Sequence, residues 1–293
     1  MITGEEISQQ LSSVSIDCAT SEWTRINKMS DENLADLNGR SRIGCKFIDR
    51  YFFAERIATK GNKGICFIDF VNDYNTVYAN KMYIQTLMRF CEKNGRYKNS
   101  MYGRLWYCYG LCFGRITPFK ITNALALYRE FRPLHIVDPF AGFGGRMAAA
   151  MLCNISYTGF DTNIYLRDGY ERMISEFGSV DQTQTINFKD SLSVDYTTPN
   201  FEYDMVLTSP PYENTEVYRH SPVRTREEWN RFYIHIFNAT WKGLSSGGVY
   251  AINISSDIYK RILLPLLGEA NEQRVLKKSS RNLYTEMIYI WKK

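Results

Sequence analysis

Apolar residues in the second part of the chain fall into two alternating kinds of segment. Short runs rich in β-branched and aromatic residues, such as SYTGFD and GGVYAINI, predict buried strands. Longer segments between them carry apolar residues three and four positions apart, which is typical of helices. Strands are expected at 134–140, 156–161, 185–190, 203–212, 247–254 and 286–291. Helices are expected at 118–131, where Pro118 suits a first turn, and at 146–153, 164–177, 226–242 and 258–267.

This alternation predicts a doubly wound α/β fold from about residue 115 onward. Each crossover helix places the next strand parallel to the one before it, so helices cover both faces of a mostly parallel, Rossmann-like sheet. Ligands of such sheets bind beyond the carboxyl ends of the strands. Polar residues at those strand ends are therefore the candidates for a functional site.

The first 114 residues follow a less regular pattern. Residues 1–40 are polar, and short helices are expected near 5–11 and 31–38. The run KGICFIDF at 63–70 predicts a strand, and 76–91 predicts a helix that ends near 94–95. We therefore expect a mixed or helical N-terminal extension at 1–114, followed by an α/β domain at 115–293.

The net charge of +5 lies wholly in the N-terminal part of the chain. Residues 1–130 hold 18 Lys and Arg against 13 Asp and Glu, whereas residues 131–293 hold 18 of each. Within 81–120, eight basic residues and one acid, Glu92, are interleaved with nine aromatic residues. Such a mixture suits a phosphate backbone with unstacked bases, and it equally suits a solvated face over an aromatic core. Both interpretations stay open.

Composition excludes several classes of protein. The chain is 44% hydrophobic and 23% charged, as ordinary globular domains are. Its seven cysteines show no CxxC spacing and no nearby histidine pair, which indicates reduced core thiols and no metal site. The N-terminus is polar and acidic, and no apolar run approaches the roughly 18 residues of a membrane span. We expect an intracellular protein with no membrane partner.

A glycine turn follows the first expected strand of the α/β domain. Asp138 ends that strand, and GFGG at 142–145 lets the backbone approach a ligand closely. Asp161 ends the next strand, 23 residues after Asp138, where an acid suits the hydroxyls of a ribose. Turn and acid together predict a site for a nucleoside-type cofactor. Asp190 ends the third strand, where it either reaches an adenine amine or caps a turn.

The most informative string is TSPPY at 208–212, directly after a buried strand. Each proline fixes its own φ and restricts the residue before it, so the turn is rigid. The turn presents two hydrogen-bond acceptors, the Ser209 hydroxyl and the Pro210 carbonyl, beside the ring of Tyr212. Two acceptors that grip the N–H groups of an exocyclic base amine favour a tetrahedral nitrogen, and an aromatic ring stacks on a base swung out of its helix.

The two motifs together resemble a known family. DPFAGFGG followed by TSPPY looks like the S-adenosylmethionine-dependent amino-methyltransferases that act on cytosine N4 or adenine N6 of DNA. TPFKITNALAL, DPFAGFGGRM, TSPPYENTEVY and REEW are similar to small methylases of phages and viruses. The resemblance covers residues 115–293, and residues 1–114 resemble no family that we can name. It implies a class I methyltransferase fold and a DNA partner, inside a cell or, for a viral protein, in the host cytoplasm or nucleus.

The resemblance also implies a role for each matching residue. Those expected to surround S-adenosylmethionine are Thr117, Pro118, Phe119, Asp138, Pro139, Phe140, Gly142, Gly144, Asp161 and Asp190. Those expected to hold the target base are Ser209, Pro210, Pro211 and Tyr212. Adenine enzymes of the family more often carry Asp or Asn where Ser209 stands. The resemblance therefore favours cytosine N4, keeps adenine N6 as the alternative, and implies neither a metal nor a covalent intermediate.

Polar residues outside these motifs have weaker assignments. Glu213 and Glu216 follow the TSPPY turn and are candidates to accept a proton or contact the base edge. Three arginines beyond the turn are candidates for backbone phosphates, namely Arg219, Arg224 and Arg226. The dispersed histidines are more simply structural than metal-binding or basic, namely His135, His220 and His235.

Two further functions fit the same sequence. One is the same methylation chemistry on RNA bases. The other is a methyltransferase-fold protein that binds nucleic acid or a partner without turnover. The intact GFGG turn, Asp161 and the SPPY motif disfavour this last hypothesis, because a site that has lost its activity usually loses one of them.

Overall fold

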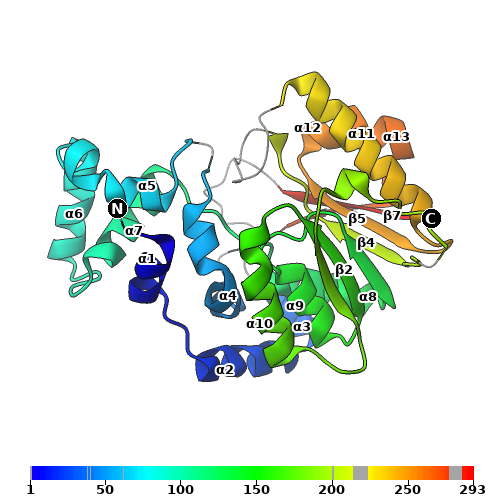
Figure 1. Ribbon diagram of the computed structural model, residues 1–293, viewed down its shortest axis with the longest axis horizontal. Coiled ribbons are helices and arrows are strands. Elements are labelled where there is room, and N and C mark those ends of the chain that lie inside the picture. The colour runs from blue at the N-terminus through cyan, green and yellow to red at the C-terminus, as the bar shows by residue number, and fades with distance from the viewer. Residues whose placement is uncertain are drawn as a thin grey trace.

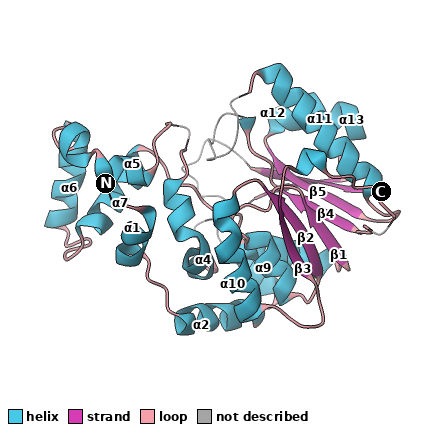
Figure 2. Cartoon of the chain, in the orientation of Figure 1, coloured by secondary structure: helices cyan, strands magenta, loops and turns pink. Residues whose placement is uncertain are grey.

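A seven-stranded sheet forms the centre of the larger part of the protein (Figures 1 and 2). The computed structural model describes residues 2–37, 39, 41–61, 63–199, 201–213, 224–276 and 286–293. Strand order is β3-β2-β1-β4-β5-β7-β6. Strands β1 to β5 pair with one another in parallel, and β7 is antiparallel to both β5 and β6. The strands are β1 His135–Asp138, β2 Ser156–Asp161, β3 Gln184–Phe188, β4 Met205–Thr208, β5 Val249–Ile254, β6 Glu272–Val275 and β7 Met287–Lys292.

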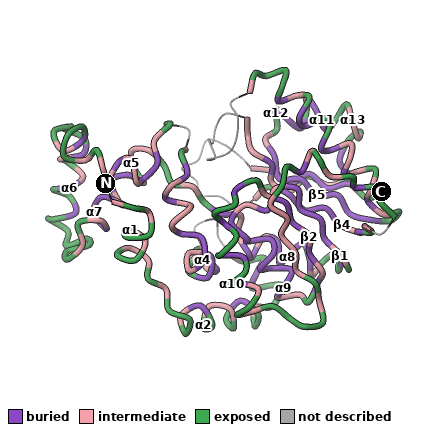
Figure 3. Tube along the Cα trace, viewed as in Figure 1, coloured by how far each residue is buried: buried purple, intermediate pink, exposed green. Residues whose placement is uncertain are grey.

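Neighbouring residues of the central strands point to opposite faces of the sheet. Ile136 and Met205 belong to one hydrophobic cluster, which we name the first-face cluster, and Val137 and Val206 belong to the second-face cluster. Ile136 pairs with Met205 and Val137 with Val206 in the parallel register of β1 and β4. The strands are accordingly buried on both sides, as parallel strands of doubly wound folds are (Figure 3).

Helices cover both faces. The first-face cluster includes residues of α8 Ile121–Phe131, α9 Gly145–Leu152 and α10 Arg167–Phe177. The second-face cluster includes residues of α11 Arg226–Gly243, α12 Ser256–Ile258 and the π-helical segment η5 Tyr259–Leu263, with α13 Leu264–Leu267 following. Short 3-10 turns lie at η2 Ile164–Leu166 and η3 Ser191–Ser193.

The N-terminal part is helical and divides between two cores. Its elements are α1 Gly4–Leu11, α2 Ile16–Asn27, α3 Asp31–Asp36, α4 Cys45–Ala58, α5 Phe67–Asn72, π-helical η1 Tyr74–Tyr78, α6 Met82–Lys93 and α7 Met101–Cys112. Buried residues of α2, α3 and α4 join the first-face cluster. Those of α1 and α5 to α7 form a separate N-terminal cluster, at the left in Figure 1.

Helix α4 belongs to both cores. Its residues Phe47 and Phe52 lie in the first-face cluster, whereas Phe53 and Ile57 lie in the N-terminal cluster. Arg50 of the same helix donates to Glu176 of α10 from both Nε and Nη2, at 3.0 and 2.9 Å. The hydrophobic clusters therefore divide within α4 and not at residue 115. The assignment of 1–114 and 115–293 to separate roles stays a prediction.

The comparison with the predicted elements is uneven. All six predicted strands of the α/β part are present, as are the short helices near 5–11 and 31–38. The strand predicted at 63–70 is wrong, because Phe67 and Phe70 are spaced for a helix and both are buried in α5, which Cys66 caps. The helix predicted at 76–91 is divided into η1 and α6, and the helix predicted from Pro118 begins at Ile121. Elements that the pattern did not predict are α2, α4, α7 and β6.

Within the described ranges, the protein has no helix that is both long and apolar enough to cross a membrane.

Candidate active site at the carboxyl edge of the sheet

A pocket of about 530 Å³ lies at the carboxyl ends of the parallel strands. Residues that follow β1, β2, β3 and β4 meet there, as expected of a doubly wound sheet. Of the predicted site residues, those that line it are Thr117, Pro118, Phe119, Pro139, Phe140, Gly142, Asp161, Asp190, Ser209, Pro210, Pro211 and Tyr212. The structure thus brings the two motifs together in one cavity, and only Asp138 and Gly144 of the predicted set do not line it.

Asp161 and the glycine turn form one wall of the pocket. The Gly142 amide donates to Asp161 Oδ2 at 2.9 Å, and the Asn163 amide donates to Oδ1 at 2.8 Å. Gly142 has a φ of 60°, a conformation that side chains disfavour, which explains a glycine at this point of the turn. Burial raises the pKa of Asp161 to about 6, although the amides of Asn163 and Gly142 act to lower it. A carboxylate held in this way is an acceptor with a fixed direction.

Asp138 lies behind the pocket and is not among its lining residues. It is fully buried, and its carboxylate accepts from Arg146 Nε at 2.5 Å, from the Tyr157 hydroxyl at 2.5 Å and from the Thr208 hydroxyl at 2.6 Å. Burial acts to lower the pKa of Arg146, but the charge and hydrogen bond of Asp138, together with the nearby Tyr157 and Tyr128, make the net shift upward. The Asp138 carboxylate therefore joins β1, β2, β4 and α9 behind the pocket. Its predicted place beside the methionine part of a cofactor stays a prediction.

The glycines of the turn also divide between two tasks. Gly144 has a φ of 70° and faces inward, where a Cβ would contact the ring of Phe52 at 2.8 Å, so its place is structural. Gly145, which was not among the predicted site residues, lines the pocket, and a Cβ there would collide with the Phe119 carbonyl oxygen. This close approach places the Thr-Pro-Phe element of 117–119 against the glycine turn.

Asp190 caps a turn, as one of the two interpretations of the sequence expected, and its contact with an adenine amine stays a prediction. It lines the pocket, and its Oδ1 accepts from the Leu192 amide at 3.0 Å as the N-cap of η3. The cap fixes the carboxylate at the edge of the cavity. Asp190 is thus a turn-capping residue that also faces the pocket.

The TSPPY turn is held from below by two polar side chains. The Tyr233 hydroxyl of α11 donates to the Pro211 carbonyl at 2.6 Å and accepts from the Glu213 amide at 3.0 Å. Asn253 Oδ1 accepts from the Ser209 hydroxyl at 3.1 Å and from the Tyr212 hydroxyl at 2.9 Å. In the described part of the chain, no protein hydrogen bond to the Pro210 carbonyl is found, and Pro210 lines the pocket. The turn is therefore rigid and presents acceptors to the cavity.

Among the pocket residues that sequence reasoning missed are two buried polar ones, Asn253 and Arg146. Asn253 lines the pocket from the end of β5 and is 3% exposed. Arg146, which is also 3% exposed, lines the pocket and lies with its guanidinium 5.0 Å from the ring centre of Phe119. Each was visible as a polar residue inside an apolar segment, VYAINI for Asn253 and RMAAAML for Arg146. A buried polar group needs partners, and that requirement was the available signal.

The weaker candidates are distributed as follows. Glu213 is paired with Arg261 at 2.6 Å and is not positioned as a free base. Arg224 lines the pocket with its guanidinium 4.8 Å from the rings of Trp229 and Phe232. Residues outside the described ranges are Glu216, Arg219 and His220. Arg226 Nη2 lies 3.7 Å from Asp257 Oδ2. His235 is exposed on α11. His135 lies at the amino end of β1, on the opposite side of the sheet from the pocket edge.

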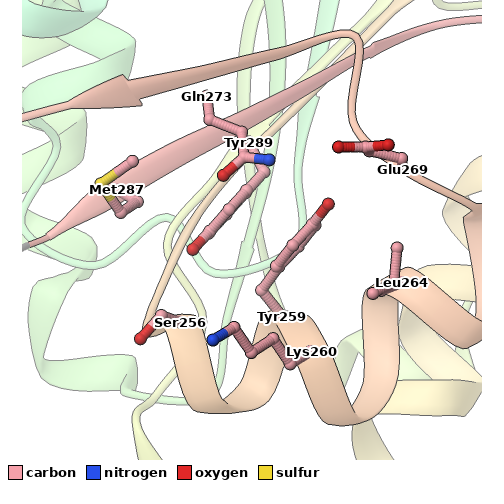
Figure 4. Close-up of a pocket in the computed structure, with 8 residues that line it drawn as sticks. All are labelled: Ser256, Tyr259, Lys260, Leu264, Glu269, Gln273, Met287 and Tyr289. Atoms are coloured by element: carbon pink, nitrogen blue, oxygen red, sulfur yellow. The ribbon is translucent and has the colours of Figure 1, made fainter.

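A second pocket, of about 480 Å³, contains none of the predicted residues. It lies between η5 and the β6–β7 hairpin, where the rings of Tyr259 and Tyr289 stack with centres 3.8 Å apart (Figure 4). Among the described residues, no group of three His, Cys, Asp or Glu side chains is arranged to hold a metal ion. The predicted site residues that line a cavity therefore all lie in the first pocket.

The strand order, with the antiparallel strand β7 between β5 and β6, decides the fold class. The fold is Rossmann-like, of the class I methyltransferase type. No protein-family model and no curated protein matches the sequence. Similar solved structures include TrmN from Thermus thermophilus, with a TM-score of 0.44 and 17% identity over 59% of this chain and 48% of that chain. The match thus spans about half of the Thermus protein.

Two other solved structures are similar at the same level. A SAM-dependent methyltransferase from Agrobacterium tumefaciens has a TM-score of 0.44 and 16% identity over 61% of this chain and 66% of its own. An rRNA methylase from Streptococcus thermophilus has a TM-score of 0.42 and 12% identity over 61% of this chain and 98% of its own.

Proposed function

We propose that the protein transfers the methyl group of S-adenosylmethionine to an exocyclic amine of a DNA base, with cytosine N4 favoured over adenine N6. The observation that carries this proposal is the shared cavity. The Asp161 wall and the acceptor turn of Ser209 and Pro210 face one space of about 530 Å³. A methyl donor and a base amine held by these two walls would meet inside it.

The residues present fit S-adenosylmethionine. The Asp161 carboxylate is fixed by two amides and is suited to accept from ribose hydroxyls. Asp190 is suited to the adenine amine, while the Thr-Pro-Phe element and the glycine turn are left for the methionine part. The bound cofactor would supply an electrophilic methyl group on a sulfonium centre.

The TSPPY turn fits the other reactant. A base amine shares its nitrogen lone pair with the ring and is a poor nucleophile. Hydrogen bonds from its N–H groups to Ser209 Oγ and the Pro210 carbonyl favour a tetrahedral nitrogen, while Tyr212 stacks on the flipped base. With the cofactor held by Asp161 and the glycine turn, its methyl carbon would be the electrophile. The amine held by Ser209 and Pro210 would be the nucleophile, and it would release one proton to water. The protein's contribution is in-line placement of the two atoms.

The choice of DNA and of cytosine rests on the family resemblance. Ser209 is the residue that the cytosine-N4 enzymes more often carry at this position, yet its hydroxyl accepts from either amine. Methylation of RNA is the second candidate. It is kept because no described residue distinguishes a deoxyribose from a ribose beside the target base.

The first test measures cofactor binding and product separately. Calorimetry should show that S-adenosylmethionine binds the intact protein. Asp161→Ala should weaken this binding by at least about tenfold, since a lost hydrogen bond to a charged group costs about 1.5–3 kcal/mol.

The second measurement identifies the product. The protein is expressed in a host without DNA methylation, and nucleoside mass spectrometry of the DNA and RNA of that host should reveal N4-methylcytosine. N6-methyladenine, or methylation in RNA alone, would replace the favoured substrate by the corresponding alternative.

Tyr212→Ala separates the two halves of the pocket. It should abolish the methylated product because the base loses its stacking surface, while S-adenosylmethionine affinity stays within about twofold. Asp161→Ala is the matched control, since it should weaken cofactor binding first. Equal loss of cofactor binding and product in Tyr212→Ala would contradict the assignment, and no cofactor binding by the intact protein would overturn the enzymatic function itself.

A further inference from the structure

Asn253 connects the base-binding turn to strand β7. Its Oδ1 lies 3.1 Å from Ser209 Oγ and 2.9 Å from the Tyr212 hydroxyl. Its Nδ2 donates to the Met287 carbonyl on β7 at 2.9 Å. The residue is 3% exposed and lies near the carboxyl end of β5, directly under the turn.

The Met287 carbonyl fixes which way the amide of Asn253 faces. A carbonyl oxygen only accepts hydrogen bonds, so the NH₂ group must be the part that points at it. The reversed amide would place two carbonyl oxygens against each other and leave both without a donor in a buried place. Oδ1 therefore faces Ser209 and Tyr212.

The orientation of Asn253 determines where the two hydroxyl protons lie. Oδ1 is an acceptor, so a contact of 3.1 Å with Ser209 Oγ and of 2.9 Å with the Tyr212 hydroxyl requires each hydroxyl to donate inward. A hydroxyl has one proton and two lone pairs. With the proton committed to Asn253, Ser209 has only lone pairs left for the pocket.

We propose that Asn253 is a positioning and specificity-determining residue that makes the base subsite accept hydrogen bonds only. Such a subsite holds an amino group, as at cytosine N4 or adenine N6, and rejects a keto oxygen in the same place, because two acceptors would then face each other. This inference rests on the proposed function and deepens it. It explains the selection of an amine through a residue that lies beneath the turn.

A purely structural role for Asn253 makes different predictions. As a tie between β5, β7 and the turn, its loss would lower the stability of the protein and leave the choice between amino and keto bases unchanged. Discrimination between the two bases, and coupling to Ser209, are therefore the measurements that separate the two roles.

The experiment compares Asn253→Leu and Asn253→Asp in the full chain with the unmodified protein. Substrates are oligonucleotides carrying the base methylated by the intact protein, and matched ones with cytosine changed to uracil or adenine to hypoxanthine. We expect kcat to fall about 10- to 100-fold in Asn253→Leu, while S-adenosylmethionine affinity changes by less than about threefold. A keto base has no amine to methylate, so the preference is measured as the ratio of the dissociation constants of the keto-base and amino-base oligonucleotides. This ratio should fall by at least about tenfold.

The Asn253→Asp variant covers the case in which Asn253→Leu fails to fold. It keeps an acceptor toward Ser209 but loses the donor to Met287, so the second carboxyl oxygen needs a proton to face that carbonyl. The amino-over-keto preference of this variant should therefore recover as pH is lowered. Thr240→Val is the control for the loss of a buried polar group outside the pocket. Thr240 of α11 is fully buried and its hydroxyl is hydrogen-bonded to that of Tyr250.

A double-mutant cycle with Ser209→Ala completes the test. If Asn253 acts through the Ser209 hydroxyl, Asn253→Leu should lower kcat by a smaller factor in the Ser209→Ala variant than in the unmodified protein. Full additivity, or unchanged amino-over-keto preference in both Asn253 variants, would overturn the inference while leaving the methyltransferase proposal intact. Absence of base methylation by the unmodified protein would instead overturn the proposed function.

Discussion

At the residue scale, two strand-end aspartates have opposite roles. Asp138 and Asp161 both end a strand and both stand next to the glycine turn. Asp138 is fully buried and neutralised by Arg146, whereas Asp161 lines the pocket with amide partners alone. The difference comes from one residue of α9 that carries a guanidinium. Burial of the Asp161 carboxylate, which has no directly paired cation, raises its pKa to about 6.

The first residue-scale prediction concerns the pH dependence of cofactor binding. Burial raises the pKa of Asp161 to about 6 in the free protein, so its carboxylate gains a proton as pH falls through 6. Ribose hydroxyls donate to the anionic form, and binding is therefore strongest above pH 6. The dissociation constant for S-adenosylmethionine, measured by calorimetry, should rise by about tenfold per pH unit below that value.

Asp161→Asn supplies the control for this pH dependence. It cannot titrate, so its weaker affinity should stay constant between pH 5 and pH 8. A flat curve for the unmodified protein over the same range would show that Asp161 does not contact the ribose.

At the element scale, helices α6 and α7 sort the basic and aromatic residues that the sequence mixes. Trp106 and Tyr109 pack within the N-terminal cluster, which is the aromatic core that one interpretation expected. Phe90 and Tyr97 are 40% and 46% exposed. The Arg96 guanidinium lies 5.6 Å from the ring centre of Phe90. The buried rings fit the interpretation of a solvated face over an aromatic core, and nucleic-acid binding by the exposed basic residues stays a prediction.

The element-scale prediction is that the exposed side binds nucleic-acid phosphates. The variant carrying Arg89→Gln, Lys93→Gln and Lys98→Gln, all at exposed positions, should bind duplex DNA more weakly at low salt. The slope of log K against log salt concentration should become shallower by about 2 to 3, since each phosphate contact releases about 0.9 counterions. Fluorescence anisotropy at several salt concentrations measures both quantities.

A matched triple substitution on α2 and α4 tests whether net charge alone is responsible. Arg25→Gln, Lys28→Gln and Lys46→Gln remove the same charge from exposed positions. Equal salt slopes for the two triple variants would argue against a specific surface on α6 and the loop that follows it.

At the scale of the whole molecule, the sequence predicts the sheet and the pocket better than the helical part. The strands that the sequence predicted contain compact apolar runs, unlike the polar β6 Glu272–Val275. In a doubly wound sheet the carboxyl ends of the parallel strands meet at one edge, which places the residues after them together. The N-terminal helices pack on two cores at once. Helix α4, with the sequence CKFIDRYFFAERIA, is apolar on more than one side, so no single stripe predicts it.

The same limit applies inside the site. The predicted motifs lie in the pocket because they occupy loops after strands. The inward turn of Asp138 and Gly144 could not be predicted, since it depends on Arg146 and Phe52, which approach from other elements. Asn253 went unpredicted because its partners are 44 and 41 residues away along the chain.

A whole-molecule prediction follows from the packing of Phe52. Its ring is 1% exposed and lies 4.9 Å from that of Tyr170 in α10. Phe52→Ala should lower the free energy of unfolding by about 3–5 kcal/mol, as other buried phenylalanine truncations do. Urea denaturation followed by circular dichroism measures this loss.

Phe90→Ala serves as the control, because its ring is 40% exposed and its loss should cost less than about 1 kcal/mol. If Phe52→Ala left the unfolding of the sheet unchanged, the N-terminal helices would have to be an independent unit.

Helix α4 also links the motions of the two cores. Openings that expose amide hydrogens of α1 and α7 must loosen the carboxyl-terminal half of α4, where Phe53 and Ile57 are anchored. A ligand in the pocket stabilises the sheet by mass action, and with it the amino-terminal half of the same helix. Occupancy of the pocket should therefore slow hydrogen exchange in helices that do not line it.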